Sequence, residues 1–63
     1  MKAKFIGTTS MGFKKGQVYD IRTKVEELHY NGYDIKCICV YDNYSKAWCP
    51  YKNLEYVLEN WEF

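Results

Sequence analysis

The 63-residue sequence contains no long hydrophobic run, and its beginning, MKAKFIGTTSMG, has only isolated apolar residues between Lys and Thr. A transmembrane helix needs about 20 consecutive apolar residues, and a signal peptide needs an apolar segment of about 7 to 15. We therefore expect no membrane partner, no secretory signal and a cytoplasmic location. The cysteine count agrees, because three cysteines do not make the even disulfide set of a small secreted domain.

A large excess of charge of either sign is also missing, since nine basic and eight acidic residues leave a formal net charge of +1. This balance argues against a simple polyanion binder. The charges are nevertheless segregated, because residues 1–24 contain a single acidic residue, Asp20, whereas residues 25–63 contain seven. Two interpretations stay open: the two halves steer a charged partner, or they attract each other as neighbouring strands.

No residue spacing typical of a metal site is present. One His and three Cys would together complete a tetrahedral zinc shell, namely His29, Cys37, Cys39 and Cys49. Zinc-binding turns place two ligands two to four residues apart on a turn. Cys37 and Cys39 instead occupy positions i and i+2 of a predicted strand, so their thiols lie about 7 Å apart on one face. We interpret the cysteines as small buried apolar residues and expect no metal and no cofactor.

Catalytic constellations are missing as well. A Cys–His pair needs hydrogen-bond contact, but the predicted strand pairing separates His29 from the thiols. Glu26 and Glu27 point to opposite faces if that segment is a strand, and the glycines do not follow a phosphate-binding spacing. We therefore expect a protein that is not an enzyme.

One proline, no internal repeat and no low-complexity linker indicate a single domain over residues 1–63. Folding a chain of this length removes only about 60% of its unfolded surface from water, so the hydrophobic core is marginal. The sequence has three Phe, two Trp and seven Tyr. These aromatic residues supply the extra apolar bulk that a small core needs.

Asn31-Gly32 gives the strongest local signal, because this dipeptide is the preferred two-residue hairpin turn, in which both positions need a positive φ. Strands over 23–30 and 33–41 then pair antiparallel, with opposite charges and apolar partners matched. The predicted pairs are Tyr30–Tyr33, His29–Asp34, Leu28–Ile35, Glu27–Lys36, Glu26–Cys37, Val25–Ile38 and Thr23–Val40. A helix from Thr23, with Glu26 completing a capping-box pattern, is the competing interpretation, but the segment before the turn is too short for a stable helix.

Further strands are predicted over 2–6, 17–24 and 46–51, where apolar and polar residues alternate. A turn at 42–45 sets the third strand of the sheet beside 33–41, with the pairs Val40–Ala47, Ile38–Cys49 and Cys39–Trp48. Asn53 is expected to cap a helix of about two turns. The apolar stripe of this helix is Leu54, Val57, Leu58 and Trp61.

Aromatic residues near the second turn make the first candidate site. Exposed Trp and Tyr side chains are typical of protein-binding patches, and the predicted register leaves Tyr41 and Trp48 on the face opposite the core. The candidate protein-binding residues are Tyr41, Trp48 and Tyr51, with Lys14 and Lys15 in a neighbouring loop. Two alternatives stay open: the terminal helix covers this patch, or a homodimer forms through the patch or through an exposed strand edge.

Single-stranded nucleic acid is the alternative partner, because small barrels bind it with aromatic platforms in a basic groove. The basic first half would supply the site, and Tyr19 is a further stacking candidate. The candidate residues are Lys2, Lys4, Phe13, Arg22 and Lys24. The seven acidic residues of the second half argue against this alternative.

Two stretches, FKKGQVYDI (13–21) and AWCPYKNLEYVLENW (47–61), resemble small SH3-like β-barrel proteins of phages and prophages of Gram-positive bacteria. The second stretch is also similar to the end of an SH3 domain, although Pro50, Asn53 and Tyr56 are more widely spaced and a polyproline groove has no counterpart. The resemblance implies a mainly β fold, a small SH3-like barrel of about five antiparallel strands with a short C-terminal helix. It also implies a non-catalytic accessory protein that contacts a host or phage protein.

Overall fold

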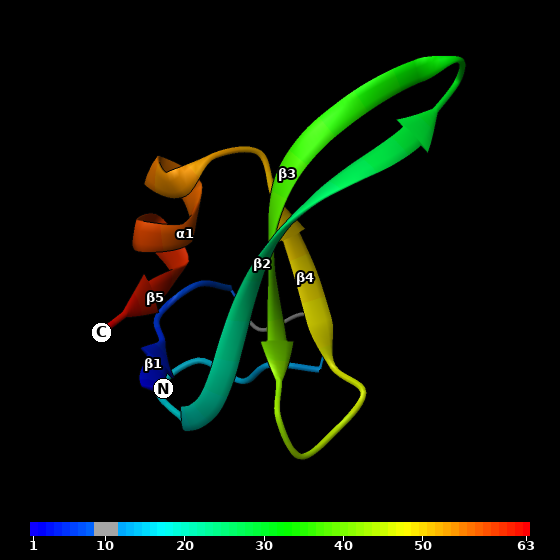
Figure 1. The fold of residues 1–63 in the computed structure, drawn as a ribbon. Coiled ribbons are helices and arrows are strands. Elements are labelled where there is room, and N and C mark those ends of the chain that lie inside the picture. Colours follow the sequence, from blue (N-terminus) through cyan, green and yellow to red (C-terminus); the bar gives the residue numbers. More distant parts are fainter. Residues whose placement is uncertain (9–11) are drawn as a thin grey trace.

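The computed structural model describes residues 1–8 and 12–63, and for Tyr30 it describes the backbone alone. Within these residues the elements are β1 (Lys2–Phe5), β2 (Val18–Tyr30), β3 (Tyr33–Asp42), β4 (Trp48–Tyr51), α1 (Leu54–Asn60) and β5 (Trp61–Glu62). The strands form one antiparallel sheet in the order β4-β3-β2-β1-β5 (Figure 1). The expected mainly β fold with a short helix is therefore confirmed. The described sheet is open, with β4 and β5 at its two ends.

The β2–β3 hairpin has the predicted register, which runs from Tyr30 opposite Tyr33 to Ile21 opposite Asp42. Asn31 and Gly32 adopt φ angles of 50° and 79°, the positive values that the two-residue turn requires. Because β2 is one continuous strand of 13 residues, the competing helix is wrong, and the strands expected over 17–24 and 23–30 are a single element. The far end of this hairpin projects well beyond the rest of the sheet (Figure 1).

The predicted β3–β4 register is wrong by two residues. The observed pairs are Ile38–Tyr51, Cys39–Pro50, Val40–Cys49 and Tyr41–Trp48. The prediction closed a two-residue turn at Asn43-Tyr44, which would need positive φ at both positions, but neither residue adopts it. The connection is instead longer, and the Asp42 N–H donates to the Ala47 carbonyl at 3.0 Å. Because the shift is even, every side chain stays on its predicted face.

Helix α1 begins as expected, with the Asn53 side chain accepting a hydrogen bond from the Tyr56 N–H at 3.1 Å. The predicted apolar stripe is only partly right, because Val57 is buried whereas Leu54 and Leu58 are exposed. Trp61 is buried for a different reason. It ends the helix in an extended conformation, opens β5 and pairs with Phe5 of β1, so it enters the core as a strand residue.

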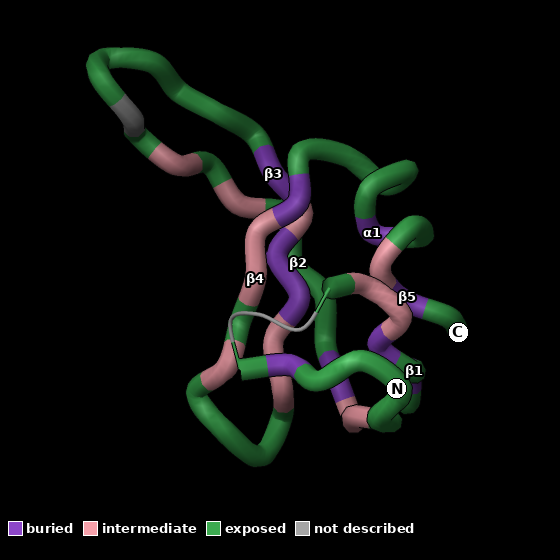
Figure 2. Tube along the Cα trace, turned by 180° about the vertical axis from the view of Figure 1, so that it is seen from behind, coloured by how far each residue is buried: buried purple, intermediate pink, exposed green. Residues whose placement is uncertain are grey.

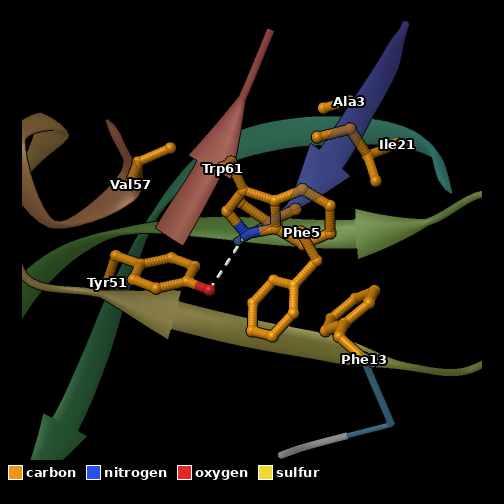
Figure 3. Packing of buried hydrophobic residues seen from close by; sticks show 8 residues of the cluster. Ala3, Phe5, Phe13, Ile21, Tyr51, Val57 and Trp61 are labelled. Carbon is orange, nitrogen blue, oxygen red and sulfur yellow. Dashed lines mark hydrogen bonds between the residues drawn. The ribbon is translucent and has the colours of Figure 1, made fainter. Parts of the chain in front are cut away.

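The core lies at one end of the sheet, around the Trp61 indole (Figure 3). The rings of Phe5 and Phe13 lie 5.0 and 4.9 Å from it, both with edge-on geometry, which is a favoured arrangement for aromatic pairs. The cluster consists of Ala3, Phe5, Phe13, Ile21, Val40, Tyr51, Val57 and Trp61. We call the part of the protein around this cluster the body. Figure 2 shows that burial is concentrated in the body, whereas the projecting hairpin is mostly exposed.

Candidate binding surface

The face of the sheet opposite the core also carries large side chains, and we call it the outer face. Alternation along β2, β3 and β4 places every second side chain there. On the body of the protein the outer face consists of Arg22, Lys24, Glu26, Cys37, Cys39, Tyr41, Trp48 and Pro50. Because these residues stand opposite one another across three paired strands, their positions are fixed by backbone pairing rather than by a loop.

Tyr41 and Trp48 are direct cross-strand partners, and their rings stack at a centroid distance of 5.9 Å with an interplanar angle of 17°. The Arg22 guanidinium lies 4.9 Å from the centroid of the Tyr41 ring, within the range of a cation–π contact. Arg22 also donates to the Asn43 side-chain oxygen at 3.1 Å. Trp48 keeps 39% of its surface exposed, so an ordered stack presents one large apolar ring to solvent.

The hydroxyl of Tyr41 donates a 2.7 Å hydrogen bond to the Glu26 carboxylate, and Lys24 lies 3.5 Å from the same carboxylate. Hydrogen bonding to the charged form, chiefly from Tyr41, lowers the pKa of Glu26. The same bond raises the pKa of Tyr41 to about 12, because ionised tyrosine would lose its donor proton beside a carboxylate. The pair therefore holds the Tyr41 ring in place at neutral pH.

Cys37 and Cys39 are both buried, and their sulfur atoms lie 3.6 Å apart. The predicted separation of about 7 Å is therefore wrong for the thiols, because the two side chains lean toward each other along the strand. Burial raises the pKa of Cys39 to about 12, so this thiol stays protonated and is a poor nucleophile. Within residues 1–8 and 12–63, no group of three His, Cys, Asp or Glu side chains is arranged to hold a metal ion.

The other two members of the hypothetical zinc set lie elsewhere. Cys49 is half-buried on the core side of β4, and His29 forms an ion pair with Asp34 on the projecting hairpin. His29 has its predicted pair, whereas Cys49 lies on its predicted face but pairs with Val40 instead of Ile38.

Tyr51 does not join the outer face. It is buried on the core side, and its hydroxyl accepts a 2.9 Å hydrogen bond from the Trp61 indole N–H. Burial raises the pKa of Tyr51. Tyr51 faces the core because side chains alternate along β4. Trp48 and Pro50 share one face, and Cys49 and Tyr51 share the other, so only the first pair can face outward.

Lys14 and Lys15 are exposed, but they belong to the segment that covers the core side. The Lys14 N–H donates to the Tyr19 hydroxyl at 2.8 Å, and the Tyr19 ring packs edge-on against Phe13 and Trp61. This contact ties the segment to the face opposite Tyr41.

The residues proposed for nucleic acid are also divided. Phe13 is 1% exposed and has no free ring face on which a base could stack. Lys2 and Lys4 are exposed on β1, and their pairing with Asp20 and Val18 sets them on the same side of the sheet as Arg22 and Lys24, which lie on the outer face. On β2, β3 and β4 the outer face thus combines two of the five residues of each predicted set.

Sequence reasoning missed Glu26 as a member of this site, and it did not connect Arg22 with Tyr41. The signal was present, because extending the predicted hairpin register by one further pair places Arg22 directly opposite Tyr41. Glu26 lies on the same face four pairs along the hairpin, within reach of the Tyr41 hydroxyl.

A small hollow lies on the other side of the hairpin, where β4 ends. Its volume is about 230 Å³, and it is lined by Val25, Lys36, Cys37, Ile38, Lys52, Asn53 and Leu54. Val25 and Leu54 are exposed there, although Val25 was predicted to line the interior. Val25 stands opposite Ile38, at the last pair that β4 extends, and the buried core cluster includes neither residue.

Comparison with protein-family models, characterised proteins and solved structures finds no match to this chain. Among the described residues, no helix combines the length and apolarity needed to cross a bilayer.

Proposed function

We propose that this protein is a non-catalytic binding module that contacts another protein through the outer face around Tyr41 and Trp48. The observation that carries the proposal is the exposed Trp48 ring, which stacks on a Tyr41 ring held by both Arg22 and Glu26. An aromatic anchor that is already ordered loses little conformational freedom on binding. Trp, Tyr and Arg are also the residue types enriched at the energetic centres of protein interfaces.

The chemistry of the outer face supports binding rather than catalysis. The Glu26 carboxylate is occupied by Tyr41 and Lys24, so it is not a free general base. The Cys39 thiol is buried and protonated at neutral pH.

Single-stranded nucleic acid is the second candidate ligand, since Arg22 and Lys24 lie beside two stacked aromatic rings and aromatic platforms with basic flanks bind single strands. Protein is favoured because the Glu26 carboxylate is bonded to Tyr41 on this face and would repel phosphates. The guanidinium of Arg22 is also already engaged by the Tyr41 ring.

For the fold we propose a small SH3-like barrel. Five antiparallel strands, a long connection after β1 and a short helix between β4 and β5 support this assignment. From the resemblance of residues 13–21 and 47–61 we further propose a cytoplasmic phage or prophage accessory protein, whose partner is a host or phage protein.

Affinity capture from a Gram-positive bacterial lysate tests the proposed binding. The baits are the wild type, Trp48→Ala and a matched control, Tyr56→Ala, which removes an exposed aromatic ring from α1. We expect a protein that the wild type and the control retain and that Trp48→Ala loses. Identical captures by all three baits would refute the outer face as the binding site.

A titration with a single-stranded oligonucleotide, followed by tryptophan fluorescence, separates the two candidates. Binding at low salt that disappears at high salt would favour nucleic acid, because phosphate contacts are strongly salt-dependent. The proposed protein function predicts no fluorescence change at either salt concentration.

A further inference from the structure

The projecting part of the hairpin, residues 27–36, which we call the arm, consists of two strands that pair only with each other among the described residues. β1 covers β2 at residues 18–20, and β4 covers β3 at residues 38–41, so neither strand reaches the arm. An isolated two-stranded ribbon is marginally stable in water. The arm also exposes apolar surface, since Tyr33 and Ile35 are 71% and 43% exposed. The arm therefore has the features of an incomplete sheet.

The pairing shows which residues of β3 direct their backbone N–H and C=O groups to its free edge. The Asp42 N–H bonds to Ala47 next to β4, and backbone groups alternate in direction along an antiparallel strand. Even-numbered residues of β3 therefore direct their N–H and C=O groups away from β2. Within the arm these residues are Asp34 and Lys36, which have no neighbouring strand.

We propose that a second copy of this chain pairs antiparallel with the free edge of β3 about a two-fold axis at Ile35. In this register Asp34 of each copy stands opposite Lys36 of the other, and the two Ile35 side chains face each other. Both ionic pairs are attractive, and opposite-charge and apolar cross-strand pairs stabilise sheets. Asp34 and Lys36 are also the residues whose backbone groups are free, so each pair exchanges backbone hydrogen bonds.

The residues around the free edge of β3 are also compatible with a second copy of the chain. In the proposed register Tyr33 of the second copy stands opposite Cys37, one of the residues that line the hollow at the end of β4. The arm of the second copy thus runs past the hollow and its exposed Val25 and Leu54. Lys52 at this hollow adds positive charge on the side where Asp34 of the second copy arrives.

The other edge of the arm is less complementary to itself. The Ile21 N–H bonds to Met1, so odd-numbered residues of β2, including Glu27 and His29, direct their backbone groups to this edge. Two-fold pairing centred on Glu26 or Glu27 would oppose two carboxylates. Pairing centred on Leu28 would oppose Glu27 to His29, which attract only when the imidazole is protonated.

The two-fold axis has a structural consequence. A lysine on a free edge normally prevents edge-to-edge pairing, but Asp34 two residues away makes one register attractive. This register uses the free edge of β3 in both copies, so the contact closes as a dimer and does not continue as a fibre. The arms would then form one four-stranded sheet, independent of the outer face around Trp48.

Sedimentation equilibrium at neutral pH tests the dimer. We expect the mass to rise from the monomer value of 7.6 kDa to twice that value between about 10 µM and about 1 mM, the range suited to a small interface. A monomer throughout this range would overturn the proposal.

Two charge variants test the register. Asp34→Lys alone sets Lys against Lys in both pairs, and Lys36→Asp alone sets Asp against Asp, so each variant should raise the dimer dissociation constant about tenfold or more. An equimolar mixture restores attraction in both pairs and should form a heterodimer at wild-type concentrations. Circular dichroism checks that each variant is folded. Homodimerisation of either variant as strong as the wild type, or a mixture that stays monomeric, would overturn the register.

Two proline variants identify the edge. Lys36→Pro removes an N–H from the free edge of β3, and the matched control Glu27→Pro removes one from the free edge of β2. Neither N–H takes part in the hairpin's own ladder, so both variants should keep the hairpin. We expect Lys36→Pro to abolish dimerisation and Glu27→Pro to leave it unchanged. The reverse result would overturn the assignment to β3. In the wild type, concentration-dependent protection of the Asp34 and Lys36 amides from hydrogen exchange supports β3, and protection of the Glu27 amide instead would overturn it.

Discussion

The two tryptophans lie in opposite kinds of environment. Their comparison explains how so short a chain has both a hydrophobic core and an exposed aromatic surface. Trp61 is 1% exposed and contacts the rings of Phe5, Phe13 and Tyr19. Trp48 is 39% exposed, and Tyr41 is its one ring partner among the described side chains. Trp61 closes the core from the chain's end, whereas Trp48 stands on the opposite face of the sheet.

The difference comes from strand parity rather than from residue type. Successive side chains on a strand point to opposite faces, so β3 contributes Val40 to the core and Tyr41 to the outer face. The two faces also use polar atoms differently. The Tyr51 hydroxyl satisfies a buried indole N–H, whereas the Tyr41 hydroxyl holds an ionised carboxylate near solvent.

Replacing Trp61 should have the largest effect of the changes that test this comparison. We expect Trp61→Ala to lower the free energy of unfolding by about 3 to 5 kcal/mol, because it removes the central ring of the core and leaves a cavity. For a domain of this size such a loss approaches the whole stability. Urea denaturation followed by circular dichroism measures it. A loss below about 1 kcal/mol would mean that Trp61 is not the centre of the core.

Tyr51→Phe should have the next largest effect. The ring stays, but the indole N–H of Trp61 loses its acceptor, and a buried donor left without a partner costs about 1 to 3 kcal/mol. The same denaturation experiment in a Trp61→Phe background is the control, because no indole N–H remains there. Equal losses in both backgrounds would show that the hydrogen bond is not the cause.

Most of the hairpin was predictable because its determinants are local. Asn31-Gly32 fixes the turn and the pairing of charges fixes the register, so the observed pairs agree with the sequence. The turn after Asp42 has no comparable signal, and the predicted β3–β4 register was wrong by two residues. Residue 61 shows another limit, because spacing alone does not reveal that Trp61 leaves the helix to pair with Phe5, 56 positions earlier in the chain.

The site was half predictable for the same physical reason. Tyr41 and Trp48 follow from alternation, whereas Tyr51 was included in the patch although it shares its parity with Cys49, which faces the core. Phe13 lies outside any regular pattern, and its burial depends on contacts with Phe5, Tyr19 and Trp61. The contact between Tyr41 and Glu26 joins residues on two strands, and the register reveals it only when it is followed four pairs along the hairpin, from Arg22–Tyr41 to Glu26–Cys37.

Trp48→Ala should cost far less than Trp61→Ala. The ring is partly exposed and has one aromatic partner, so we expect a loss of about 1 kcal/mol or less in the free energy of unfolding. The remaining fluorescence would come from the buried Trp61 and should lie at shorter wavelength than in the wild type. A loss as large as that of Trp61→Ala would mean that the outer face is a second core rather than a binding surface.

Tyr41→Phe should have the smallest effect and a distinct pH dependence. The lowered pKa of Glu26 contributes stability above the ordinary glutamate pKa of about 4.3, and this contribution disappears as the pH falls through the lowered value. The raised pKa of Tyr41 contributes stability below the ordinary tyrosine pKa of about 10, and this contribution disappears as the pH rises through about 12.

The wild type should therefore be more stable than Tyr41→Phe between these limits, and the difference should shrink toward both acid and alkaline pH. Urea denaturation across the pH range measures it, and an NMR titration should show the Glu26 pKa rising toward its ordinary value in the variant. Tyr33→Phe, which changes a tyrosine that is 71% exposed on the arm, is the matched control and should give no such pH-dependent difference. A constant difference across the whole range would mean that Tyr41 stabilises the outer face through its ring alone, without the bond to Glu26.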